Sequence, residues 1–202
     1  MKLLNDEILV SYVDRSDPLL VKGLTRPPDW FAKDSPIQPS SIDLHIGSIY
    51  LPGAKLSEKG SEITPLGAHT LLPGQTAVVV TLETLCLPNN VAAVGFPPSH
   101  VSVKGLLMTN PGHVDPGYSG LMRFTVINMG RENFDLLRGF TIVTLLFFEM
   151  SSPAKRDYGV RNAGATFGPP RSTSCPRTSW TSQIGQRELL KTKPRALTSG
   201  AT

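Results

Sequence analysis

The sequence has little of what several common protein classes require. It holds only two cysteines in 202 residues, Cys86 and Cys175, and these isolated positions form neither a metal-binding spacing nor a disulfide framework. No apolar run approaches the roughly 20 residues needed to cross a bilayer. Residues 1–7 lack the apolar core of a signal peptide. These absences predict a reduced, cytoplasmic protein without a membrane partner.

Charged residues are also few, at 18% of the chain, whereas glycine and proline number 18 each. This composition favours a turn-rich β protein over a helical one. Short apolar stretches separated by Pro-Gly turns predict an all-β fold with short helices, either an antiparallel β-barrel or a distorted jelly roll. We expect strands near residues 42–46, 48–51, 70–72, 75–82 and 91–95, and helices near 5–13 and 99–104.

The net charge of +4 is unevenly placed along the chain. Residues 155–202 carry +7, which leaves −3 for the remainder. A basic segment often binds a polyanion, but this one has few aromatic residues, so a solvated tail is expected and a nucleic-acid partner is disfavoured. We therefore divide the chain into an N-terminal helix and loop (1–36), a β-barrel domain (37–159) and a basic, flexible C-terminal arm (160–202).

The central motif is residues 109–120, Thr-Asn-Pro-Gly-His-Val-Asp-Pro-Gly-Tyr-Ser-Gly. Apolar stretches on both sides predict two strands joined by a compact hairpin with Asp115 and Tyr118 at its tip. A carboxylate fixed on a rigid turn can orient and deprotonate a water, and a neighbouring ring can stack under a sugar or base. For an isolated Asp-Pro-Gly, a turn-capping role is the simpler interpretation. The choice between this role and a catalytic one therefore depends on motifs elsewhere in the chain.

This motif resembles the third motif of the dUTPase and dCTP deaminase superfamily. The dUTPase version ends in Asp-x-x-Tyr-x-Gly, and the deaminase version reads Asp-Pro-Gly, an aromatic residue, Ser and Gly. Further partial matches follow in order through residues 37–159, beginning with Ile-Gln-Pro-Ser-Ser-Ile-Asp-Leu-His-Ile-Gly and ending with Ser-Pro-Ala-Lys-Arg-Asp-Tyr. The resemblance implies a dUTPase-like β-barrel, a homotrimer with sites at subunit boundaries, and a pyrimidine deoxynucleoside triphosphate as substrate.

The resemblance also implies roles for individual residues. Asp115 matches the catalytic aspartate and Tyr118 the ring that packs under the deoxyribose. Ser99 matches a serine of the second motif that grips the triphosphate. Asp43 matches an aspartate in the metal-proximal part of the site, although a strand aspartate satisfied by backbone donors is an equal alternative. His45 is interpreted as an ordinary strand residue, because nothing near it in the sequence completes a metal site.

Other residues are candidates for substrate contacts. Asn110 and Gly112 offer amide or backbone groups to the edge of the pyrimidine. Lys104 can supply positive charge to the phosphates. Arg161 begins a stretch that faintly resembles the dUTPase fifth motif, whose arm closes over the nucleotide, although this stretch also fits a Gly-rich linker. Mg²⁺ is expected to bind together with the triphosphate.

Two departures from the superfamily pattern limit the activity. Pro98 stands where the second motif has an arginine, and proline cannot replace a bidentate guanidinium. Thr125 stands ten residues beyond Asp115, where deaminases have the glutamate that shuttles protons, and a threonine hydroxyl is no general base at neutral pH. The pattern therefore favours hydrolysis of dUTP to dUMP and pyrophosphate over deamination of dCTP. A non-catalytic, nucleotide-binding or regulatory homologue is the competing class.

Overall fold

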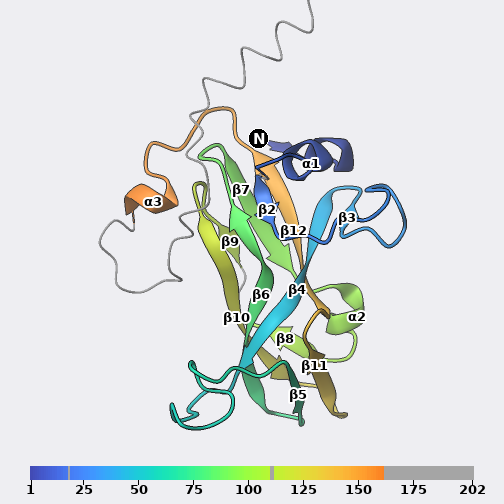
Figure 1. The fold of residues 1–202 in the computed structure, drawn as a ribbon, viewed down its shortest axis with the longest axis vertical. Coiled ribbons are helices and arrows are strands. Elements are labelled where there is room, and N and C mark those ends of the chain that lie inside the picture. The colour runs from blue at the N-terminus through green and yellow to red at the C-terminus, as the bar shows by residue number, and fades with distance from the viewer. Residues whose placement is uncertain (18, 110–111, 162–202) are drawn as a thin grey trace, which may run out of the picture.

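A computed structural model describes residues 1–17, 19–109 and 112–161 (Figure 1). Its helices are α1 (Asp6–Val13), α2 (Ser99–Ser102) and α3 (Tyr158–Arg161). Its strands are β1 (Lys2–Leu3), β2 (Leu20–Lys22), β3 (Ile37–Gln38), β4 (Ser41–Tyr50), β5 (Ala68–Leu71), β6 (Thr76–Cys86), β7 (Val91–Phe96), β8 (Leu106–Met108), β9 (His113–Val114), β10 (Ser119–Asn128), β11 (Phe134–Leu137) and β12 (Thr141–Glu149). None of the helices in these ranges is long and apolar enough to span a membrane.

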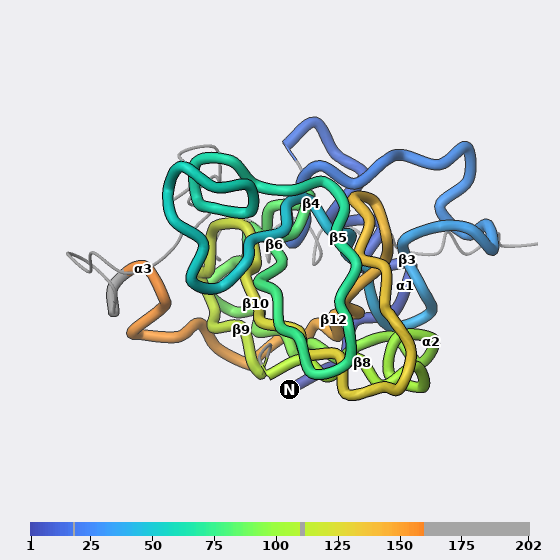
Figure 2. The backbone as a smooth tube through the Cα atoms, turned by 90° about the horizontal axis from the view of Figure 1, so that it is seen from below, coloured from blue at the N-terminus to red at the C-terminus, as the bar shows by residue number. Residues whose placement is uncertain are grey.

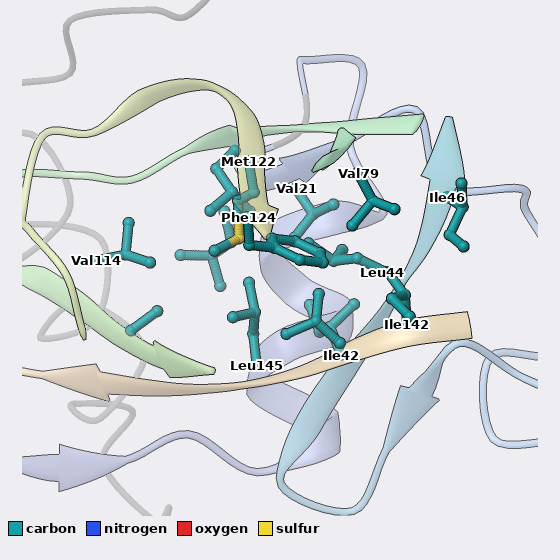
Figure 3. Packing of buried hydrophobic residues seen from close by; sticks show 14 of the residues in the cluster. Val21, Ile42, Leu44, Ile46, Val79, Val114, Met122, Phe124, Ile142 and Leu145 are labelled. Atoms are coloured by element: carbon teal, nitrogen blue, oxygen red, sulfur yellow. The ribbon is translucent and has the colours of Figure 1, made fainter. Parts of the chain in front are cut away.

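The strands form one curled antiparallel sheet with the order β8-β10-β6-β4-β12-β7-β9. Strands β1, β2 and β3 add to β12, β6 and β4, while β5 and β11 make a separate two-stranded sheet. Seen along its long axis, the backbone wraps around a central space (Figure 2), which buried side chains fill (Figure 3). The predicted all-β, barrel-like fold is confirmed, as are the helices near residues 5–13 and 99–104.

The core follows from alternation along the strands, because successive side chains of a strand point to opposite faces. Ile42, Leu44 and Ile46 of β4 are fully buried, and in β10 the inward-facing Phe124 is 1% exposed. Phe124 lies in the middle of the cluster, close to side chains from β4 and β12 (Figure 3). Each such side chain contributes about 1.5–3 kcal/mol when it is removed from water.

The curl coincides with irregular pairing at one level of the sheet. The register shifts between Ile46 and Ser48 in β4, where it pairs with β6, and between Leu121 and Arg123 in β10. A third shift lies in β12, where it pairs with His45 and its neighbours. Gly47 sits in this belt because a Cβ there would lie 2.7 Å from the carbonyl oxygen of Thr81. Bulges of this kind bend a strand and increase its twist.

Side chains replace the ladder hydrogen bonds that these irregularities remove. The buried carboxylate of Glu83 accepts the backbone N–H of His45 at 2.9 Å. The Thr81 hydroxyl accepts the N–H of Met122 at 3.0 Å and donates to the carbonyl of Glu83. The Arg138 guanidinium donates to the carbonyl of Gly47 at 2.7 Å. Since buried backbone groups need partners, these three side chains maintain the curl.

The structure corrects several predicted strand boundaries. The strand expected at residues 48–51 is the second half of β4, because the chain continues past Gly47 without a turn. Residues 14–36 were expected to be a loop but contain β2, which pairs with the end of β6. Strand β11 was not predicted. Both short strands depend on partners distant in the sequence, which local patterns do not report.

The predicted compact hairpin over residues 105–127 is wrong in its middle. Strands β8 and β10 do pair, with Met108 opposite Val126. However, β9 leaves this hairpin and pairs with β7, where Val114 lies opposite Ala93. The Asp115 turn is therefore a link between two parts of the sheet and not the tip of one hairpin.

Candidate functional site

The turn from Asp115 to Tyr118 connects β9 to β10 and is held by backbone contacts. The N–H of Tyr118 donates to the carbonyl of Asp115 at 3.2 Å, and the N–H of Gly117 donates to that of Pro88 at 3.2 Å. Gly117 has φ +77°, a conformation that glycine adopts without a steric penalty. The turn is thus fixed both internally and to the loop that precedes β7.

The Asp115 carboxylate is largely buried, with 24% of the side chain exposed, and lies 3.3 Å from Nε2 of His113. His113 is itself exposed. The sequence analysis did not select His113. The available signal was spacing, since residues two apart on an extended strand point to the same side. A carboxylate with an imidazole beside it can hold a water and accept a proton from it.

Tyr118 is turned against the protein. Its hydroxyl donates to the carbonyl of Leu121 at 2.7 Å, and its ring meets the ring of Tyr158 edge-on at 4.9 Å. Burial, with a smaller contribution from Tyr158, raises the pKa of Tyr118 to about 12. The phenol therefore stays protonated at neutral pH and offers an aromatic surface instead of a base.

The segment before and within α3 packs on this turn. The N–H of Tyr158 donates to the carbonyl of Pro116 at 2.8 Å. Asp157 lies so close to Gly117 that a Cβ on the glycine would be 2.8 Å from the Asp157 Cβ. The sequence match at the end of the barrel domain thus marks a segment that holds the Asp115 turn from outside.

The second-motif residues lie elsewhere. Ser99 and Lys104 are exposed on and just after α2, whose Val101 is fully buried and anchors it. Pro98 precedes the helix and supplies no side-chain cap. In Figure 1, α2 and the β9–β10 turn lie on opposite sides of the sheet. A single chain therefore does not bring Ser99 next to Asp115.

The remaining candidates are placed in part. The carbonyl of Gly112 accepts the N–H of Gly95 at 3.2 Å. A Cβ built at Gly112 would have no heavy atom within 4 Å. Asn110 lies outside the described residues. Arg161 is the last residue of α3 and of the described chain, and its side chain is not described. The rest of the predicted C-terminal arm, from residue 162 onward, also lies outside the described residues.

Asp43 contacts neither the Asp115 turn nor the second-motif residues around α2. Its carboxylate accepts the hydroxyl of Thr144 across the β4–β12 pair, a side-chain donor where the sequence suggested backbone donors. Among the described residues, no three His, Cys, Asp or Glu side chains come together to hold a metal ion. These residues therefore form no metal centre by themselves, and a metal-proximal role for Asp43 stays a prediction.

His45 is more than the ordinary strand residue that we expected. Its Nδ1 lies 2.6 Å from the Glu83 carboxylate, which is 3% exposed. The hydrogen bond to Glu83 raises the pKa of His45 above its ordinary value of 6.5, against the opposing effect of burial. The negative charges of Glu83 and Asp43 act in the same direction. A residue 38 positions away along the chain supplied the partner, which is why the local pattern missed it.

Thr125 occupies the outer face of β10 and is half-buried. It pairs with Val78 of β6, and its carbonyl accepts the N–H of Thr109 at 3.1 Å. Its side chain therefore projects from the same strand face as Arg123, while Phe124 points into the core. The position matched to the deaminase glutamate is thus a side chain on the outer surface of the sheet, with a hydroxyl in place of a carboxylate.

We predict that Gly117→Ala destabilises the protein more than Gly74→Ala. Both glycines have positive φ, +77° and +82°, so both substitutions carry similar backbone strain. Only at Gly117 would the added methyl meet Asp157, whereas a Cβ at Gly74 has nothing within 4 Å. The additional loss at Gly117 should be about 1–3 kcal/mol, as for overpacked sites, measured by urea unfolding. Equal losses would show that the Asp157 contact yields without cost.

The His45–Glu83 pair predicts a loss of stability as pH rises above about 6.5. Because the pKa of His45 is raised in the folded protein, the pair contributes fully below the unfolded-state pKa and is lost as pH passes through the raised value. Urea unfolding near pH 6 and pH 9 should show this decrease in the wild type and a smaller one in His45→Gln. Identical pH dependence in both proteins would contradict the assignment.

Comparisons with known proteins agree with this geometry. The profile of the dCTP deaminase-like family matches residues 28–150. A Beutenbergia cavernae protein named "dCTP deaminase, dUMP-forming" is 31% identical over 159 residues, which cover 72% of this chain and 83% of that protein. A Mycobacterium bovis protein of the same name is 29% identical over 160 residues, covering 70% and 84%.

A solved structure supports the fold. The 2'-deoxycytidine 5'-triphosphate deaminase of Agrobacterium tumefaciens superposes with a TM-score of 0.55 at 18% identity. The matched region covers 71% of this chain but only 47% of that one, so the present chain spans about half of that structure. The family profile accounts for more than half of the sequence, including β3 to β12. The chain therefore belongs to the dCTP deaminase-like family of the dUTPase and dCTP deaminase superfamily.

Proposed function

We propose that the protein hydrolyses a pyrimidine deoxynucleoside triphosphate, with dUTP as the preferred substrate, to the monophosphate and pyrophosphate. The observation that carries the proposal is the Asp115 turn, whose backbone is held by hydrogen bonds that involve Tyr118, Pro88 and Tyr158 and whose carboxylate side chain is 24% exposed. Relatives of this chain are named for dUMP formation from dCTP. Such a reaction combines removal of the amine with cleavage of the triphosphate, and the residues present favour the second step alone.

In this proposal Asp115 accepts a proton from a water whose oxygen attacks the α-phosphorus. A bond forms between that oxygen and the α-phosphorus, the bond from the α-phosphorus to the bridging oxygen breaks, and pyrophosphate leaves with the electron pair. Tyr118 remains neutral, because its pKa is about 12, and its ring packs under the deoxyribose. Pre-positioning of the carboxylate lowers the entropic part of the barrier.

The phosphates are assigned to residues on another subunit. Ser99 and Lys104 are exposed on and just after α2, which lies away from the β9–β10 turn that carries Asp115 (Figure 1), so a shared site requires a neighbouring copy, as in the homotrimer that the resemblance implies. Arg161 adds charge from the end of α3, while Asn110 and Gly112 contact the base. Mg²⁺ bound to the triphosphate would supply charge neutralisation there, with the phosphates as its ligands.

Deamination is the second candidate because the relatives carry that name. It requires a group that shuttles protons between water and the departing ammonia. Thr125 lies at the matching place on the outer face of β10 and carries only a hydroxyl. The loss of the second-motif arginine at Pro98 favours instead a third candidate, a nucleotide-binding homologue without turnover. Separation of the products of dUTP and dCTP by ion-exchange chromatography distinguishes all three.

We predict that Asp115→Asn lowers turnover of dUTP by about 10²-fold or more, because it keeps the size of the side chain but removes the general base. Nucleotide binding should be largely retained. Asp135→Asn is the matched control, since that carboxylate accepts a hydrogen bond from Thr70 in the separate two-stranded sheet. If wild type and Asp115→Asn release pyrophosphate at equal rates, or neither does so, Asp115 is not the catalytic base.

A shared site also predicts complementation between two inactive variants. Asp115→Asn and Ser99→Ala subunits should each have less than about a tenth of wild-type turnover. When the two variants are co-expressed in equal amounts and assemble at random into mixed trimers, the mixture should recover about a quarter of the wild-type rate. One subunit boundary in four then joins an intact Asp115 to an intact Ser99. Light scattering should report a trimer. Mixtures that stay inactive would assign both residues to one chain.

A further inference from the structure

The segment between β12 and α3 passes along the outside of the Asp115 turn. Its two ends are tied there by backbone hydrogen bonds: the N–H of Ala154 donates to the carbonyl of Asn89 at 2.8 Å, and the N–H of Tyr158 donates to the carbonyl of Pro116 at 2.8 Å. The segment runs beside the β9–β10 turn in two perpendicular views (Figures 1 and 2). The residues between these anchors are therefore held close to the turn that carries Asp115.

Lys155 and Arg156 occupy the middle of this tied segment, and both are exposed. Lys155 directly follows Ala154, and Arg156 lies two residues before Tyr158, so each Cα is within about 8 Å of the Cα of an anchored residue. The anchors fix the main chain, whereas long basic side chains keep their charged ends in water. Two cations therefore lie within reach of a ligand that is bound at the turn.

Lys155 and Arg156 have no carboxylate partner within the described part of the chain, since no ion pair there involves either of them. The carboxylate next to them in the sequence belongs to Asp157, which lies against the backbone of Gly117. Its Cγ would be 2.9 Å from a Cβ on that glycine. The positive charge of the two side chains is therefore available to a bound anion.

The anion that fits this place is a polyphosphate. Two adjacent cations attract a ligand that carries several negative charges over a short length, and phosphate oxygens accept hydrogen bonds from both ammonium and guanidinium groups. The second motif offers no guanidinium in this chain, because Pro98 stands at the arginine position. Lys155 and Arg156 supply charge of the missing kind in the same subunit as Asp115.

We propose that Lys155 and Arg156 bind the β- and γ-phosphates of the nucleotide whose α-phosphorus faces Asp115. This inference rests on the proposed function for the place of the nucleotide, but it concerns binding and not the chemical step. It adds ligands from the same chain to the phosphate contacts assigned to Ser99 and Lys104 of a neighbouring copy. The two residues thereby replace part of the charge that the second motif lacks.

Calorimetric titration of the full chain with three probes tests this assignment. The probes are α,β-imido-dUTP, which resists cleavage at the α-phosphorus, tripolyphosphate, which has no nucleoside, and dUMP, which has no β- or γ-phosphate. A Lys155→Gln, Arg156→Gln double variant should bind imido-dUTP and tripolyphosphate at least about tenfold more weakly, because it loses charge-assisted hydrogen bonds. Its affinity for dUMP should change by less than about twofold, because dUMP lacks the phosphates that the two residues bind.

A Lys55→Gln, Lys59→Gln double variant is the control, since it removes the same charge from exposed lysines in the loop after β4, at the other end of the sheet (Figure 1). It should leave all three affinities unchanged. Equal affinities in the wild type and the Lys155, Arg156 variant, an equal loss in the control, or no binding of either polyphosphate by the wild type would overturn the proposal. A wild type that binds imido-dUTP through these two residues but releases no pyrophosphate from dUTP would refute the hydrolysis alone.

Discussion

The buried carboxylate of Glu83 is the interaction on which the curl of the sheet depends. It accepts the backbone N–H of His45 where β4 loses its regular pairing with β6. It also binds the imidazole of the same residue. An unpaired carboxylate at that depth would be costly, and an unpaired N–H would add to the cost. The strand bends that shape the barrel are therefore stable only because polar side chains from neighbouring strands take over the missing hydrogen bonds.

The same belt decides which residues of β6 lie opposite β10. The register shifts between Leu121 and Arg123, so Leu121 lies opposite Thr84 and Arg123 lies opposite Val80. The alternation of β10 itself continues through the shift, with Arg123 and Thr125 outward and Phe124 in the core. The position where deaminases have their glutamate therefore lies on the outer face, next to different β6 partners from those of a regular ladder.

Much of the fold was predictable from local patterns, because the Pro-Gly turns and the short apolar stretches of β4, β6 and β7 act over a few residues. The superfamily resemblance, carried by the 109–120 motif, located the Asp115 turn correctly. What the sequence did not reveal were contacts between distant segments: β9 with β7, Glu83 with His45, and Asp157 with Gly117. Whether Ser99 and Asp115 act together depends on a second copy, which no pattern within one chain can show.

The pairing of β4 with β12 joins residues about one hundred positions apart. Strand β7, and through it β9 and the Asp115 turn, is attached to the sheet by β12. Contacts of such long sequence separation make folding slow, since the intervening chain must be ordered before they form. On the ribosome, strands β7 and β9 cannot join the sheet until residues 141–149, which form β12, have emerged. The turn that holds Asp115 becomes rigid later still, when Tyr158 arrives, so the newly made chain passes most of its synthesis with exposed strand edges and without a formed site.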